Sequence, residues 1–180
     1  MKYSIFSFLF FSFSSLLSQA QCDTPILETI TFTNGTEVQT SYCGTVNDRG
    51  QRDGQGRLEY ANYDVLYKNG NWKNDRLNGK GKTVFTNGQV FEGIYKNGKL
   101  TEGEFSFSNN GDLWTYKGEF NGYYFQGEGT EINDSKVRIT KKEGIFFSDN
   151  LFEGTETIKY KNSGVEITSE YVKGIATVVE

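Results

Sequence analysis

The sequence has 180 residues, with 19 Lys and Arg against 23 Asp and Glu, a formal net charge of −4 and no His. Without His, the commonest general base, the Ser-His and Cys-His catalytic pairs and most zinc sites are excluded, and the acidic charge argues against a nucleic-acid binder. A mean hydropathy of −0.58 excludes an integral membrane protein. Because 16% of the residues are aromatic and 21 are Gly, the composition favours short β-strands joined by turns.

Residues 1–20 have the three parts of a secretory signal peptide. A Lys at position 2 precedes an uncharged apolar run at 5–17, and small residues stand at 18 and 20, the two positions that a signal peptidase reads. The alternative, a membrane anchor, is disfavoured because this run is too short to cross a hydrocarbon core of about 30 Å. We therefore expect the mature chain to be exported and to be periplasmic, secreted or otherwise extracellular.

The chain has two cysteines, Cys22 and Cys43, and both follow the predicted leader. Export permits oxidation, so a disulfide between them would tie the new N-terminus to the first structural unit. The alternative is two free, small apolar side chains, and the sequence alone does not decide between these. A lipid anchor on Cys22 is disfavoured because Gln21 stands where a lipidated Cys needs Gly, Ala or Ser.

Residues 21–41 are predicted to form an N-terminal capping hairpin. A loop of three residues at 34–36 contains the turn-forming pair Asn-Gly and would set Phe32 opposite Val38. This register keeps the apolar residues on one face of the hairpin, whereas a two-residue loop would set Phe32 opposite Glu37.

Residues 42–180 repeat with a period of about 25 residues. Five-residue units with Gly in third place and an aromatic residue at the first or fifth place, or both, begin at 42, 68, 91, 116 and 142, and a degenerate sixth begins at 167. Each unit continues through a turn to a second glycine cluster, and period-2 alternation with Asn-Gly turns predicts a hairpin. Because one hairpin cannot bury its aromatic face alone, we expect an all-β, elongated, solenoid-like array of stacked antiparallel β-hairpins.

Two groups of aromatic residues are distinguished by the repeat frame. One group holds the same place in successive units and is predicted to form the shared core, with an open aromatic groove as the alternative: Trp72, Tyr95, Phe120, Phe146 and Tyr171. The other group lies outside the frame and supplies the candidate partner-binding residues: Trp114, Tyr123 and Tyr124.

No catalytic, metal or cofactor constellation is predicted. Carboxylates recur in pairs (Glu102/Glu104, Glu128/Glu131 and Glu153/Glu156), and their repeat-equivalent places indicate the solvated face of a sheet rather than an acid–base site. The Gly-x-Gly clusters lack the features of a phosphate loop, and no calcium-loop spacing exists. We therefore expect a protein that is not an enzyme.

The repeat resembles a known family. Tyr116-Lys-Gly-Glu-Phe120 followed by Gly127-Glu-Gly129 is similar to the MORN repeat (membrane occupation and recognition nexus), and the unit at 68–81 fits with Lys68 in place of the leading aromatic residue. The resemblance covers about residues 42–174 and implies five units and a degenerate sixth. It departs from the pattern mainly at the ends, as is typical of capping units.

The resemblance implies a non-catalytic interaction or scaffold module, here one that acts at the cell envelope or outside it on a protein or envelope component. The alternative is carbohydrate or cell-envelope polymer binding through exposed aromatic residues. Binding to anionic lipid is disfavoured, because removal of the leader with Lys2 makes the net charge of −4 one unit more negative. The sequence does not name the partner.

Overall fold

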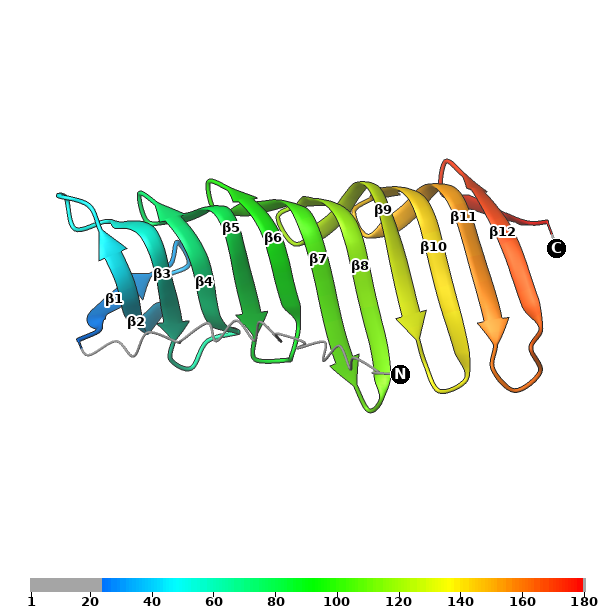
Figure 1. The fold of residues 1–180 in the computed structure, drawn as a ribbon, viewed down its shortest axis with the longest axis horizontal. Helices are drawn as coiled ribbons and strands as arrows, with labels where there is room; N and C mark the ends of the chain where they lie inside the picture. The colour runs from blue at the N-terminus through cyan, green and yellow to red at the C-terminus, as the bar shows by residue number, and fades with distance from the viewer. Residues whose placement is uncertain (1–23, 180) are drawn as a thin grey trace, which may run out of the picture.

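The structure, a computed structural model, describes residues 24–179, so the predicted signal peptide and Cys22 lie outside the described residues. One antiparallel sheet contains 13 strands in chain order, and Figure 1 shows them side by side along the long axis of an elongated molecule. The strands are β1 (Ile26–Thr31), β2 (Glu37–Val46), β3 (Arg52–Tyr60), β4 (Val65–Lys73), β5 (Arg76–Phe85), β6 (Val90–Lys96), β7 (Lys99–Asn109), β8 (Asp112–Asn121), β9 (Tyr124–Asp134), β10 (Arg138–Phe147), β11 (Asn150–Tyr160), β12 (Glu166–Val172) and β13 (Ile175–Val178). The all-β array of stacked hairpins is confirmed.

The N-terminal hairpin, β1 with β2, has a different register from the predicted one. Its loop is closed by Phe32, whose N–H donates to Thr36 O and whose carbonyl accepts from Gly35 N–H. Gly35 has φ +82°, so it takes the last loop position, which only a residue tolerant of positive φ occupies easily. Ile30 therefore pairs with Val38, two residues away from the predicted pairing, and the apolar residues still share one face.

A row of glycines crosses the sheet, with one glycine on every strand from β2 to β11. Each glycine is the direct cross-strand partner of the next: Gly44, Gly56, Gly70, Gly81, Gly93, Gly103, Gly118, Gly129, Gly144 and Gly154. A Cβ added to Gly93 would contact the carbonyl oxygen of Glu102 and lie 2.6 Å from Gly103 Cα. Neighbouring backbones thus approach more closely along this row than side chains permit.

The strands bend at the glycine row, as β8 shows. In a straight strand, residues four apart are separated by about 13 Å. Tyr116 and Phe120 flank Gly118 in β8, yet their ring centroids are 5.1 Å apart and their planes are at 88°. The two halves of the strand therefore fold toward each other over the glycine, and the sheet has an inner and an outer face.

Two rows of side chains meet on the inner face, one on each side of the glycines. We call them the leading row (Tyr42, Leu58, Lys68, Thr83, Phe91, Phe105, Tyr116, Glu131, Lys142, Glu156 and Ser169) and the trailing row (Trp72, Leu77, Tyr95, Leu100, Phe120, Phe125, Phe146 and Leu151). The Tyr116 ring stacks on Phe125 with centroids 3.9 Å apart, and Tyr42 meets Trp72 edge-on at 5.8 Å. Most of the core consists of these contacts.

The hairpin tips next to the trailing row attach each unit to the unit before it. In these turns a backbone N–H donates to a carbonyl of the preceding hairpin: Asp75 to Arg52, Gly98 to Leu77, Gly122 to Leu100, Asp149 to Phe125, and Gly174 to Phe152. Repeat stacking therefore rests on backbone hydrogen bonds as well as on aromatic burial.

Tyr171 does not hold the place that the repeat frame gave it. It pairs with Gly154, so it stands in the glycine row, two residues away from the positions of Phe120 and Phe146. Its ring packs against the core from there, and its hydroxyl donates to Glu156 Oε2 at 3.2 Å. A side chain is tolerated here because β12 is followed only by the short β13 and not by another glycine-bearing strand.

We expect Gly118→Val to lower the free energy of unfolding by a few kcal/mol. A Cβ at residue 118 would contact Glu128 O and would lie 2.6 Å from Gly129 Cα and 2.7 Å from Tyr116 Oη, and two of these three are backbone atoms that do not move easily. Thermal melting measures the effect, with Thr115→Val on the outer face of the same strand as the matched control. Equal melting temperatures for Gly118→Val and the parent would contradict the close approach.

Stability should also fall in alkali because the core phenols ionise with difficulty. Burial raises the pKa of Tyr60 and Tyr116 to about 12, against about 10 for the unfolded chain. Since the neutral phenol is favoured in the fold, this stabilisation is complete below pH ~10 and is lost as the pH rises from about 10 to 12. Melting temperatures at pH 9 and pH 11 test this, and Tyr60→Phe/Tyr116→Phe should show a smaller difference between the two.

Candidate interaction surfaces

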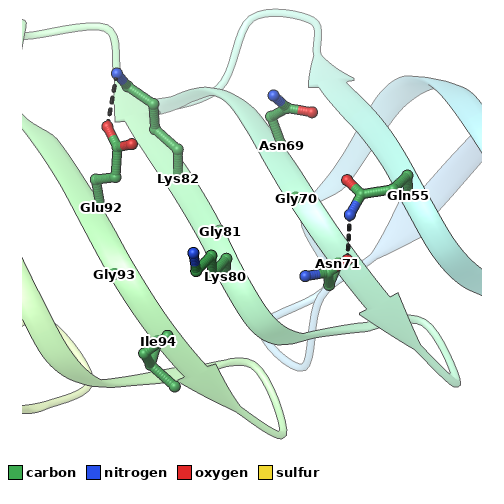
Figure 2. A pocket seen from close by; sticks show the side chains of 10 residues that line it. All are labelled: Gln55, Asn69, Gly70, Asn71, Lys80, Gly81, Lys82, Glu92, Gly93 and Ile94. Atoms are coloured by element: carbon green, nitrogen blue, oxygen red, sulfur yellow. Dashed lines mark hydrogen bonds and ion pairs between the residues drawn. The ribbon is translucent and has the colours of Figure 1, made fainter.

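The outer face of the sheet has a groove along the glycine row. Its volume is about 510 Å³, and its floor is formed by Gly70, Gly81 and Gly93. Figure 2 shows the side chains that line it on four neighbouring strands: Gln55, Asn69, Asn71, Lys80, Lys82, Glu92 and Ile94. A Cβ at Gly81 would face the Tyr95 and Leu77 side chains inside the sheet, so the outer side of this backbone forms the groove floor.

Most side chains along this groove are polar, and four of them are already paired across strands. Gln55 Nε2 donates to Asn71 Oδ1, and Lys82 Nζ lies 2.9 Å from Glu92 Oε2, as the dashed lines in Figure 2 mark. Lys82 and Glu92 also line a second hollow of about 540 Å³, which continues along the outer face past the ion pair of Glu104 with Lys117. A trough with both polar and apolar side chains along it therefore runs over several repeats.

The aromatic residues of the repeat frame do not form an open groove on the inner face. Trp72, Tyr95, Phe120 and Phe146 are 4%, 1%, 6% and 0% exposed, respectively. Trp72 Nε1 donates to Gly56 O at 2.8 Å, so the single polar group of this ring is satisfied inside the sheet. These side chains are unavailable for contact with a partner in the folded protein.

Only one of the three off-frame aromatic residues is exposed as the sequence indicated. Tyr124 is 60% exposed, but Trp114 and Tyr123 are partly buried and pack against the core. Trp114 lies 5.0 Å from the Phe105 ring, and the turn before β9 places Tyr123 4.9 Å from Phe91. Tyr123 reaches the core because the bend brings the turn of one unit over the inner face of another. Trp114 stands two residues before Tyr116 on β8, so strand alternation alone turns it to the inner face.

The leading row becomes charged toward the C-terminus, where Glu131, Lys142 and Glu156 are cross-strand partners. Glu131 is 8% exposed, so its assignment to the solvated face was wrong, and Glu156 also faces inward, partly buried. Glu128 and Glu153 are exposed, as are Glu102 and Glu104. The signal was present in the sequence, because residues three apart in a strand point to opposite faces.

Glu131 is held between two partners. Its Oε1 accepts from Trp114 Nε1 at 2.9 Å, and its Oε2 lies 3.3 Å from Lys142 Nζ in an ion pair. Removing one partner of a buried ion pair is strongly destabilising, because the remaining charge is left uncompensated. Within residues 24–179 there is no group of three or more metal-ligating side chains.

Only one of the two cysteines, Cys43, lies in the described part of the chain. Cys43 lies on β2, partly buried, and is disulfide-bonded. Cys22 lies outside residues 24–179, so the predicted pairing stays a prediction. Over the same range, no helix has the length and apolar character that a membrane crossing requires.

We expect Trp114→Ala to destabilise the protein by about 3–5 kcal/mol, because it removes a packed ring and the hydrogen bond to buried Glu131. Tyr124→Ala, which removes an exposed ring of similar size, should change the stability by no more than about 0.5 kcal/mol. Denaturant unfolding measures both. A Trp114→Ala protein as stable as the Tyr124→Ala control would contradict the structural role of this ring.

The comparison with known families gives one match. The MORN repeat model matches residues 42–65, 69–90 and 116–135, which are the first, second and fourth units. No curated protein matches the sequence. The third and fifth units lie outside the matched stretches, and both are one residue shorter between the turn and the row glycine. Leu100 and Leu151 stand one residue closer to that glycine than Leu77 and Phe125 do in the second and fourth units. The chain thus carries MORN repeats in three stretches, and they coincide with the stacked hairpins.

Proposed function

We propose that this protein is a non-catalytic, exported interaction module that acts at the cell envelope or outside it. MORN repeats are generally interaction or scaffold modules; three stretches of the chain match them, and stacked antiparallel strands make up most of the described residues. The observation that supports the proposal is the outer groove, which follows the repeat axis and has amide and charged side chains along a backbone floor. The proposed export rests on the predicted leader at 1–20.

The groove favours a protein partner that binds through an extended segment. Asn and Gln side chains line it, and each offers both a donor and an acceptor, which is what the backbone of an extended peptide requires. The flat glycine floor lets another backbone approach closely without displacing side chains. Because the sheet is continuous over 13 strands, such a segment would contact several repeats at once.

Retention of partners from the exported fraction tests this function. We expect the mature protein to retain a discrete protein, and Asn69→Trp to lower that retention at least tenfold by filling the groove. Asn69 is exposed, so the change should cost little stability. The N-terminal residue of protein recovered from that fraction, Gln21 if the leader is removed, checks export.

Thr155→Trp is the matched control. Thr155 is also exposed and lies in the same outer row beside the glycines, but on β11, away from the groove. Retention lost equally in both variants, or in neither, would contradict binding in the groove. Retention of polysaccharide instead of protein would favour the alternative function, envelope-polymer binding.

A further inference from the structure

Lys68 is the one cation in the N-terminal part of the leading row, and it has no described charge partner. It stands in β4 between Leu58 and Thr83, at the position that Tyr42 and Tyr116 hold in other units. Among the ion pairs of residues 24–179, none includes Lys68. A lysine that points into a packed inner face normally needs a partner for its charge.

The same position in the fifth unit shows how the sheet supplies such a partner. Lys142 stands between Glu131 and Glu156, and its Nζ lies 3.3 Å from Glu131 Oε2. Both lysines replace an aromatic residue of the repeat, but only Lys142 has carboxylates as its direct cross-strand partners. Lys68 therefore does not serve the internal ion pairing that explains Lys142.

Partly exposed aromatic residues surround Lys68 on both sides. On the β3 side, the Tyr60 ring centroid is 6.0 Å from Lys68 Nζ and 5.9 Å from the Tyr63 ring. On the β5 side, Phe85 meets Tyr123 edge-on at 5.2 Å. Tyr123 also directs its hydroxyl toward Thr83, at 3.5 Å. An amine, phenol hydroxyls and ring faces are thus gathered at one place on the inner face.

The electrostatics of this cluster favour an anion. Burial and the charge of Arg52 both lower the pKa of Lys68, so the ammonium form of this side chain is destabilised in the free protein. Arg52 itself is paired with Asp75 at 3.0 Å, whereas Lys68 is not. An anionic group on Lys68 would relieve both the desolvation and the repulsion, and charge-assisted hydrogen bonds are about twice as strong as neutral ones.

We propose that the inner-face cluster of Lys68, Tyr60 and Tyr123 binds an acidic carbohydrate. The carboxylate of a uronic acid would accept hydrogen bonds from the Lys68 ammonium and a phenol hydroxyl. The C–H face of the pyranose would pack on an aromatic ring, whose face is electron-rich. This site is separate from the outer groove and goes beyond the proposed function.

Calorimetric titration with galacturonate trisaccharide tests the proposal, with the uncharged galactose trisaccharide as the comparison. We expect the mature protein to bind the acidic sugar at least tenfold more tightly than the neutral one. Lys68→Met should abolish this difference, and Lys68→Arg should keep most of it. Lys80→Met, which removes an exposed cation of the outer face, is the matched control and should bind as the parent does.

Lys68→Tyr separates a binding role from a structural one, because it installs the residue that Tyr42 and Tyr116 supply elsewhere. We expect it to melt at a higher temperature than the parent and to lose the galacturonate trisaccharide. Equal binding of both sugars by the parent, or unchanged binding by Lys68→Met, would overturn the proposal. Asn69→Trp should keep galacturonate binding, because it fills the outer groove and leaves the inner-face cluster unchanged. The two proposals can therefore be tested separately. Loss of galacturonate binding in that variant would also overturn the assignment.

Discussion

The fold depends on the close approach of backbones along the glycine row. A single sheet ordinarily needs a second layer to bury one of its faces. Here the strands bend where the side chains are missing, so the two halves of one sheet serve as layers for each other. The contacts of Tyr116 with both Phe120 and Phe125 exist only because Gly118 and Gly129 allow that bend.

With the bend established by glycines, the leading row is free to change its chemistry along the axis. It is largely apolar up to Tyr116 and then becomes charged at Glu131, Lys142 and Glu156. At the N-terminal end, Arg52 takes the position that Leu77 has in the next unit. Its Cζ lies 5.4 Å from the centroid of the Trp72 ring. A cation that is paired with Asp75 can end an aromatic core without exposing the rings to water.

The sequence predicts the elements well and their three-dimensional contacts less well, for one physical reason. Period-2 alternation and Asn-Gly turns identify strands, hairpins and the buried ring of Trp72, because these depend on local spacing. The packing of Tyr123 depends on the bend, which spacing does not encode, whereas the parity that Trp114 shares with Tyr116 could have placed it on the inner face. Tyr171 was misplaced because a degenerate unit has no glycine to set its register. Glu131 could have been found, since strand parity separates it from Glu128.

The outer groove follows from the same requirement as the core, and this bears on where specificity resides. Tyr95 and Leu77 come within 3.2 and 3.3 Å of where a Gly81 Cβ would be, and the other face of that backbone forms the groove floor. Every repeat that buries its rings in this way exposes a similar floor, so the floor cannot distinguish partners. Recognition must therefore come from the flanking side chains. These are amides around Asn71 in the groove and the ion pair of Glu104 with Lys117 in the neighbouring hollow, so different stretches of one trough select different chemistry.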